Sequence, residues 1–469
     1  MASPQVAADA PAAIAPAVGT RALLALTWPL LVSQLAVLGL AAIDTVMVGR
    51  LSATDLAAVA IGMSIYASVF IGMNGVLQAL TPISGHHFGA HRWREIGLDL
   101  AQGHWLALAM AAIGMPALLF PEPWLRLAGV EHDVAVIARD YLVIIAIALP
   151  GSLLARSYIA VNAAVSRPQV AMAINLAMLA AKAPLNFLFI HGAGPLPELG
   201  GAGCALASAV LLWANAIANA LVWRLDPFYA RFRLRGARFI WPDWTRQKAL
   251  LRLGLPSGAS LLIEVTSFTF IAILLARLGA VTLGGHQIIA NLVSLLFMLP
   301  LSLGIATSVL VAQCLGANAP QLARQVALRG WRIAVGAGVV AAILMWVARS
   351  PLIGVYTTDA AVRQLALSLI TLAAIFHAFD AMQGAAGMIL RGYKVAFLPM
   401  VIHGAALWGI GLAGGYWLAY HTTFGPTHGG ATAFWLAALV GLVVTGIGLT
   451  ALANVVSREV ARDADPVEK

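Results

Sequence analysis

Three acidic residues lie inside stretches of the chain that are long and apolar enough to cross a lipid bilayer. They are Asp44, Glu264 and Asp380, out of nineteen Asp and Glu residues in all. A carboxylate at bilayer depth costs roughly 2.5 kcal/mol or more, so it usually faces the protein interior and binds a proton, a cation or a charged substrate. These three residues are therefore the first candidates for a cation-binding site.

One basic residue, Lys182, is expected at a similar depth in the membrane. It stands four residues before Asn186, which places the two on one face of the same helix. Lys182 could pair with Asp44 and hold that acid ionised until a proton or a substrate releases it. The alternatives are that Lys182 extends toward the membrane surface or forms a permanent structural pair, and that Asp44 is a helix cap at the outer end of its span.

Glu264 and Asp380 lie deep in their spans. Glu264 lies roughly nine to fourteen residues into its helix, near the middle of the bilayer at about 1.5 Å per residue, where it cannot be a cap. The alternative for Glu264 is an ion pair with a membrane lysine. His377 stands three residues before Asp380, on a nearby helix face, and could tune the proton affinity of that carboxylate. The alternative for His377 is simple packing between helices.

The composition of the chain is that of an integral membrane protein. Of 469 residues, 61% are hydrophobic and 10% are charged, and the mean hydropathy is +0.89. Apolar runs of about 20 residues recur between short charged or Gly/Pro loops, about twelve times in all. Alternating strand patterns are absent, so the spans are predicted to be helices.

The basic residues gather on one expected side of the membrane. The loops expected inside hold Arg92, Arg94, Arg156, Arg167, Arg324, Arg329, Arg391 and Lys394, and the middle connection holds Arg231, Arg233, Arg235, Arg238, Arg246, Lys248 and Arg252. The loops expected outside carry only Arg50, Arg126, Arg277 and Arg349. The distribution of these residues therefore follows the positive-inside rule, and the net charge of +9 does not indicate nucleic-acid binding. Both termini are predicted to be cytoplasmic, in a bacterial-type inner membrane.

The chain is predicted to contain two homologous lobes of six spans each. A shift of 227 residues (256 minus 29) aligns Pro29 with Pro256, Gly89 with Gly316 and Gly103 with Gly330. An even number of spans per half predicts a parallel repeat, with a central cavity between the lobes. The expected segments are a disordered tail (1–20), the N-lobe (21–224), a basic inter-lobe loop (225–249), the C-lobe (250–456) and a second tail (457–469).

A set of short motifs lies in the spans and in the turns beside them. They are Pro29-x4-Gln34, Ile43-Asp44-Thr45-Val46-Met47-Val48-Gly49, Ala183-Pro184-Leu185-Asn186, Leu253-Gly254-Leu255-Pro256, Ile263-Glu264-Val265-Thr266, Gly285-His286-Gln287-Ile288, Asp380-Ala381-Met382-Gln383 and Leu390-Arg391-Gly392-Tyr393-Lys394. Together they resemble the MATE (multidrug and toxic compound extrusion) family, in its NorM-like branch, over nearly the whole chain.

The resemblance implies secondary active efflux of cationic or zwitterionic drugs and dyes, driven by inward flow of H⁺ or Na⁺. It places Glu264 and Asp380 at the cation-coupling carboxylates of the C-lobe, which would also be the Na⁺ ligands in a sodium-coupled protein. It places Asp44 at the acid of the N-lobe, with Asn186 at a neighbouring polar position. A carboxylate that binds either a proton or a cationic substrate is a direct way to build an antiporter.

Phe376 is a departure from the family pattern. Related proteins often have a tyrosine at this position, four residues before Asp380, and phenylalanine has no oxygen for Na⁺, which prefers several hard oxygen ligands. The change favours H⁺ as the coupling ion, unless another oxygen replaces the missing one.

Two other classes of function were compared with drug efflux. A flippase for lipid-linked saccharides, from the same superfamily, should have a cationic cavity, whereas three membrane acids against one lysine favour cationic cargo. An enzyme is not indicated, because the H-E-x-x-H and G-x-S-x-G patterns are absent. The expected partners are organic cations and the lipid bilayer, without a cofactor other than the coupling ion, and the protein is expected to be a monomer.

Overall fold

The computed structural model describes residues 19–192, 198–233, 240–422 and 430–463 of the chain. Residues 1–18 of the expected N-terminal tail lie outside the described residues. So do residues 464–469 of the expected C-terminal tail and residues 234–239 of the basic loop, which include Arg235 and Arg238.

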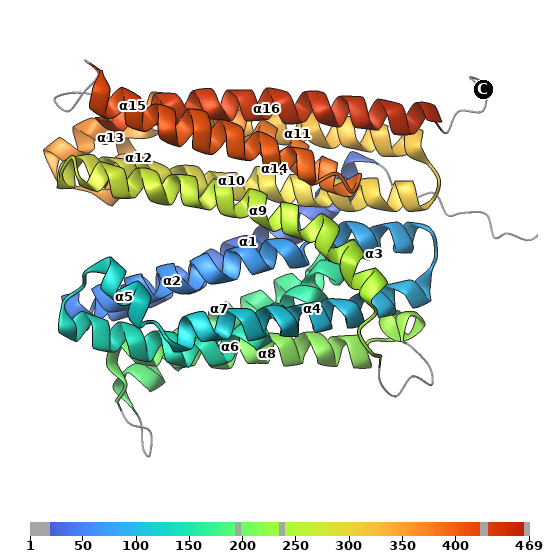
Figure 1. Ribbon diagram of the computed structural model, residues 1–469, viewed down its shortest axis with the longest axis horizontal. Coiled ribbons are helices and arrows are strands. Elements are labelled where there is room, and N and C mark those ends of the chain that lie inside the picture. Colours follow the sequence, from blue (N-terminus) through green and yellow to red (C-terminus); the bar gives the residue numbers. More distant parts are fainter. Residues whose placement is uncertain (1–18, 193–197, 234–239, 423–429, 464–469) are drawn as a thin grey trace, which may run out of the picture.

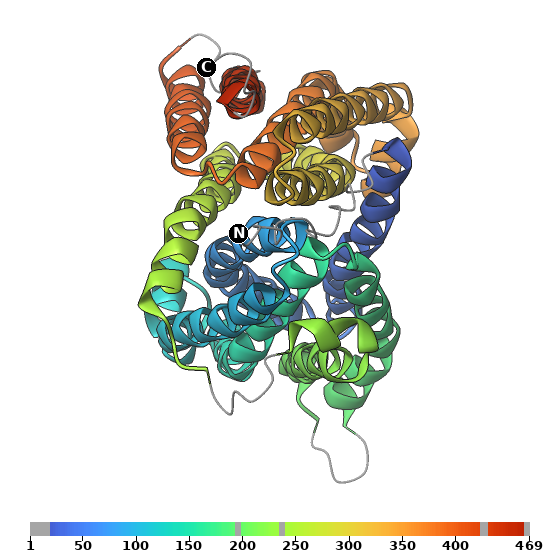
Figure 2. The same ribbon diagram turned by 90° about the vertical axis from the view of Figure 1, so that its right-hand side faces the viewer.

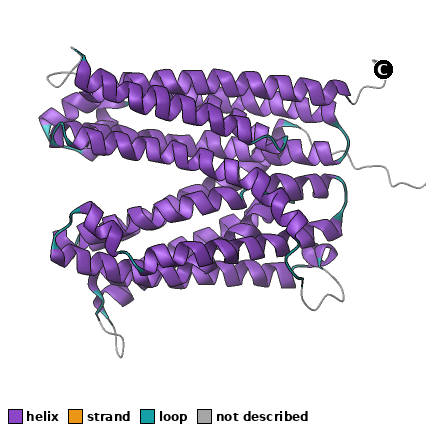
Figure 3. Cartoon of the chain, in the orientation of Figure 1, coloured by secondary structure: helices purple, strands orange, loops and turns teal. Residues whose placement is uncertain are grey.

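The described residues form helices and no strand (Figure 3). Twelve of the helices in the described ranges are long and apolar enough to cross a membrane. Because lipid offers no partner for backbone polar groups, such spans bond their N–H and C=O groups internally. The predicted all-α membrane fold, with about twelve spans in two six-helix lobes, is confirmed.

The N-lobe precedes the basic connection. It contains α1 (Thr20–Val48), α2 (Ala53–Leu77), α3 (Leu80–Gly89), α4 (Trp93–Leu119), α5 (Glu122–Ala128), α6 (His132–Ala164), α7 (Pro168–His191), η1 (Gly200–Ala202) and α8 (Gly203–Leu225). Helices α2 and α3 together make one span, Ala53–Gly89.

The C-lobe follows a short 3-10 segment, η2 (Pro227–Phe232). It contains α9 (Trp244–Ala276), α10 (Ala280–Gly316), α11 (Pro320–Val347), α12 (Arg349–Tyr356), α13 (Ala360–Gly392), α14 (Phe397–His403), η3 (Gly404–Ala413), α15 (Gly414–His421) and α16 (Gly430–Asp463). The η3 segment is a π-helix, and α14, η3 and α15 together make one span.

Part of the basic connection is helical. The Asp243 side chain accepts a hydrogen bond of 2.9 Å from the backbone N–H of Thr245 and caps α9. Arg246, Lys248 and Arg252 therefore lie on the first turns of α9 rather than in a loop.

The two lobes lie side by side and exchange helix contacts. In Figure 1 the C-lobe lies above the N-lobe, and the ribbons spread toward the end that carries α5 and α12. Figure 2 shows α1 and α9 on opposite sides, each reaching toward the other lobe. Helix α1 packs on α10, and α9 packs on α2. These contacts are equivalent under the repeat, because the 227-residue shift relates α1 to α9 and α2 to α10.

The lobes meet tightly where α3 and α10 end, a region called here the closed end (His86, Gly89, Gln313 and Gly316). A Cβ built on Gly89 would overlap the backbone oxygen of Gln313, and one built on Gly316 would overlap that of His86. The 227-residue shift relates His86 to Gln313 and Gly89 to Gly316. The two halves of the contact are thus equivalent, and both depend on a residue without a side chain.

Side-chain hydrogen bonds reinforce the closed end. The ring Nε2 of His86 lies 3.1 Å from the backbone oxygen of Gly392, to which it donates. The side-chain Nε2 of Gln313 donates to the backbone oxygen of Ala164 at 2.7 Å and to the hydroxyl of Ser166 at 2.8 Å. Each lobe therefore uses one side chain from the end of a long helix to bind the end of a helix in the other lobe.

Candidate functional site

The N-lobe site is a buried ion pair between α1 and α7. The Lys182 ammonium lies 2.8 Å from Oδ1 of Asp44, and the side chains are 1% and 5% exposed. The Asn186 amide donates to the same oxygen at 2.7 Å. Lys182 also donates to the hydroxyl of Ser208 at 2.6 Å and to the Cys204 carbonyl at 3.4 Å, so its three donors are used. The pair places Asp44 in the packed interior and not at a helix cap.

A cavity of about 300 Å³ opens beside this ion pair. Its wall is mainly apolar and aromatic, with Tyr66, Phe70 and Met178 among its residues, and it also includes Asp44 and Lys182. Tyr66 and Phe70 stack with ring centroids 5.7 Å apart. A mixed wall of this kind suits an apolar, partly aromatic molecule that carries a charge.

Arg156 lines the same cavity, which corrects its expected place in a loop. It lies within α6, and its guanidinium carbon is 5.6 Å from the centre of the Phe70 ring. Among the described residues no carboxylate forms an ion pair with it. Lys182 is therefore not the only basic side chain that lines this interior cavity.

A chain of buried amides links the N-lobe cavity to η2, and the sequence did not reveal it. Each side chain donates to the next, in the order Tyr229, Asn162, Asn219, Asn215, Asn175 and Ser33, over distances of 2.7–3.2 Å. Burial raises the pKa of Tyr229 to about 12, so its hydroxyl stays protonated and donates. Asn175 and Asn215 line the cavity, so the chain fixes one of its walls.

The C-lobe site joins both predicted carboxylates through one amide. The Gln383 amide nitrogen lies 3.2 Å from Oε1 of Glu264 and 3.0 Å from Oδ1 of Asp380. His403, on α14, holds the other end of the amide, with its Nε2 3.0 Å from Oε1 of Gln383. Gln383 belongs to the motif that begins at Asp380, but the sequence did not indicate a role for it. The sequence did not indicate His403 either, because only the packing of α14 brings it near the carboxylates.

A cavity of about 260 Å³ borders the C-lobe site. Glu264, Asp380, Gln383 and His403 line it together with Arg391. Arg391 donates to the side-chain oxygen of Gln78 at 2.9 Å, a contact between the lobes. Arg391 thus joins Lys182 and Arg156 as a basic group that faces the interior, where the sequence placed it only in a loop.

Phe376 and His377 are buried on α13 without a hydrogen bond to the carboxylates among the described residues. Phe376 packs edge-on against Phe268 and Trp435, with centroids 5.8 and 5.4 Å away, and supplies no oxygen to the site. His377 is fully buried, and neither ring nitrogen has a hydrogen-bond partner among the described residues. No hydrogen bond within that part of the chain joins His377 to Asp380.

The described residues contain no group of three or more His, Cys, Asp or Glu side chains arranged to hold a metal ion. Glu264 and Asp380 therefore offer two carboxylates, but Na⁺ prefers a larger set of oxygen ligands.

Replacing Lys182 by methionine is expected to destabilise the protein, because Asp44 would stay buried without its partner. Breaking one side of a buried pair costs about 3–5 kcal/mol, and the Asn186 bond should keep the loss near the lower value. The melting temperature of the purified protein should fall, and the double variant Lys182→Met/Asp44→Asn should recover most of it. An unchanged melting temperature for the single variant would show that the pair does not stabilise the fold.

Comparisons with known proteins give the family. The MatE family model matches residues 29–188 and 256–417, and the two starting points are again 227 residues apart. The chain is 42% identical to the probable multidrug resistance protein NorM of Aromatoleum aromaticum, over 92% of this chain and 93% of the relative. It is 34% identical to the multidrug resistance protein MdtK of Pectobacterium atrosepticum, over 94% of this chain and 96% of the relative.

Solved structures share the fold. The eukaryotic MATE transporter AtDTX14 superposes with a TM-score of 0.84 at 21% identity, over 95% of this chain and 99% of that one. The Vibrio cholerae MATE transporter VcmN, in its bent form, gives 0.80 at 20% identity, over 95% of this chain and 97% of that one. With the family model matched in both lobes, the chain belongs to the MATE family of membrane transporters and to no class of enzymes.

Proposed function

We propose that this protein is a secondary active multidrug efflux transporter. It exports cationic or zwitterionic drugs and dyes by antiport with H⁺, through alternating access of its two lobes, as a monomer with both termini on the cytoplasmic side of a bacterial-type inner membrane. The observation that carries the proposal is that each lobe holds a buried carboxylate, Asp44 or Asp380, beside a cavity whose wall is partly apolar. Relatives named as multidrug resistance proteins support it.

The hydrogen bonds of Gln383 are compatible with proton binding at the C-lobe carboxylates, and they support the choice of H⁺ over Na⁺ in this proposal. The Nδ1 of His403 faces the Pro399 carbonyl at 2.8 Å and must carry a hydrogen, because a carbonyl only accepts. Nε2 of His403 faces the other end of the amide at 3.0 Å, and the Gln383 nitrogen donates to one oxygen of each acid. When these acids are ionised, they can bind a cationic drug.

Protonation of one carboxylate changes the charge of the site without breaking these bonds. The new carboxyl O–H is a donor, while the carbonyl oxygen of the same group can still accept from the Gln383 amide. The negative charge that attracts the drug is lost at the same time. Proton and drug therefore compete for the C-lobe site, and each stabilises a different state of the lobes.

A flippase for lipid-linked saccharides is the second candidate, and a specific observation favours it. Arg156 and Arg391 line cavities, so the basic side chains that face the interior, with Lys182, equal the three acids in number. The excess of acidic over basic side chains, on which the sequence argument against a flippase depended, is therefore smaller than expected. A cavity with both signs of charge also suits a zwitterionic drug.

The proposal is tested by ethidium efflux from energised, pump-deficient cells, with the proton and sodium gradients collapsed separately. Wild-type cells are expected to extrude dye faster than empty-vector cells. Their efflux should stop when a protonophore is added and should continue in sodium-free buffer. Efflux that stops only without Na⁺ would contradict proton coupling. If no dye or related cation moves under any gradient, drug efflux fails and lipid-linked cargo becomes the better candidate.

A further inference from the structure

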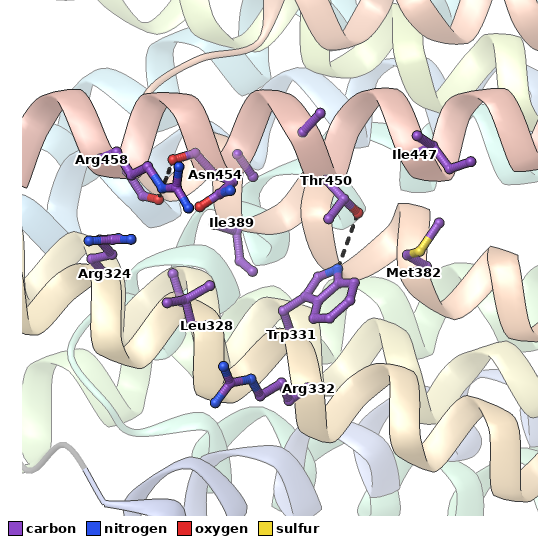
Figure 4. A pocket seen from close by; sticks show the side chains of 14 residues that line it. Arg324, Leu328, Trp331, Arg332, Met382, Ile389, Ile447, Thr450, Asn454 and Arg458 are labelled. Atoms are coloured by element: carbon purple, nitrogen blue, oxygen red, sulfur yellow. Dashed lines mark hydrogen bonds between the residues drawn. The ribbon is translucent and has the colours of Figure 1, made fainter.

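A third cavity, of about 620 Å³, lies in the C-lobe between α11, α13 and α16. Figure 4 shows its wall, in which side chains of α11 face those of α16. It shares no residue with the N-lobe cavity, nor with the cavity beside Glu264 and Asp380. It is called here the arginine groove.

One end of the arginine groove is strongly basic. Arg324 of α11 and Arg458 of α16 form this end, and Arg332 stands eight residues, about 12 Å, deeper along α11. None of the three forms an ion pair with a carboxylate among the described residues. The Nε of Arg324 is buried without a hydrogen-bond partner in that part of the chain. A buried donor without a partner is costly, so an acceptor is expected here.

The other end of the groove is apolar. Met382 and Ile447 line it, Ile447 is 57% exposed, and Leu328 lies between the two ends. A hydrogen bond of 3.2 Å from the Trp331 indole to the Thr450 hydroxyl joins the two walls. Ile447 and Arg458 are eleven residues apart on α16, so the apolar end lies about 16 Å along the helix from the basic end.

We propose that the arginine groove binds an anionic phospholipid. Its phosphate lies between Arg324 and Arg458, and an acyl chain follows the helices toward Ile447. Arg332, deeper along α11, extends its guanidinium toward the same phosphate, as long basic side chains do at a membrane surface. A soluble anion would leave the apolar end unfilled, and a zwitterionic lipid would bring the positive charge of its headgroup close to the arginines.

The position of the groove fits such a ligand. The basic end lies toward the end of the bundle that the positive-inside rule assigns to the cytoplasm, where a leaflet presents anionic headgroups. The lipid would connect α11 with α16, helices that already share the Trp331 contact. This inference does not depend on which drug or ion the transporter carries.

Native mass spectrometry of the purified full chain tests the proposal, with dioleoylphosphatidylglycerol and dioleoylphosphatidylcholine as probes. The variant Arg324→Gln/Arg458→Gln is expected to need about tenfold or more phosphatidylglycerol for the same occupancy as wild type. The control Arg92→Gln/Arg94→Gln removes the same charge from exposed positions on the same expected side and should behave as wild type. Equal binding by the two double variants would overturn the proposal.

A second variant tests the acyl chain without changing the charge. Ala451→Trp places a large side chain in the groove at an exposed position, where refolding is not at risk. It should also weaken phosphatidylglycerol binding, while inorganic phosphate should fail to displace the lipid from wild type. Displacement by phosphate, or full binding by Ala451→Trp, would show that the groove holds only an anion.

Discussion

Cells that carry Asp380→Asn are expected to lose ethidium efflux driven by the proton gradient, with an initial rate at least about tenfold below wild type. Asparagine keeps the size of the side chain and still bonds Gln383, which lies 3.0 Å from Asp380. It cannot ionise, so it can neither attract a cationic drug nor release a proton. Because coupling needs both states of the carboxylate, the expected loss is one of transport and not of folding.

The same helix supplies a matched control. Asp359 caps α13, accepts a hydrogen bond of 2.9 Å from the backbone N–H of Val362, and is exposed. Asparagine caps helices as well as aspartate does, so Asp359→Asn should keep both stability and efflux. Protein amount and melting temperature should match wild type in both variants. Gradient-driven efflux at the wild-type rate in Asp380→Asn would remove the C-lobe carboxylates from the mechanism.

Much of the fold could be predicted from the sequence, because lipid allows few structures. An apolar run of about 20 residues without a partner for its backbone must be helical, so span number and fold class followed directly. The cost of a carboxylate in lipid likewise singled out Glu264 and Asp380, which the structure joins through Gln383. The repeat register also aligned Gly89 with Gly316, which the structure places at equivalent contacts with Gln313 and His86.

The partners of these residues could not be predicted, because they depend on packing between spans. Arg156 lies near the end of a 33-residue helix, longer than a membrane requires, so its sequence position fits either a loop or a cavity wall. Only its contact with Phe70 shows that Arg156 lies in the cavity wall. His403 lies in a different span from Gln383, and no spacing rule connects them. For His377 the helical spacing was correct, but the packing leaves it without a bond to Asp380.

Gly89→Ala is expected to hold the closed end apart and to lose at least about fivefold in transport. Its Cβ would overlap the backbone of Gln313, which a side-chain rotation cannot relieve. Overpacking costs typically about 1–3 kcal/mol, and at about 1.4 kcal/mol per tenfold this lowers the population of the closed arrangement about 5- to 150-fold. Alternating access needs that arrangement, so the variant should spend most of its time with this end open.

Spin labels at Arg94 and Gln325, on opposite lobes near the closed end, can measure the change once the native Cys204 and Cys314 are replaced by alanine. Gly89→Ala should shift the distance distribution to longer values, and Gly316→Ala should do the same because the repeat makes the two contacts equivalent. Gly336→Ala is the matched control, since a Cβ there meets no atom within 4 Å. An unchanged distance with full transport in Gly89→Ala would show that the lobes do not need this contact. A longer distance with normal dye binding but no efflux would place the defect in the lobe movement and leave the carboxylate chemistry intact.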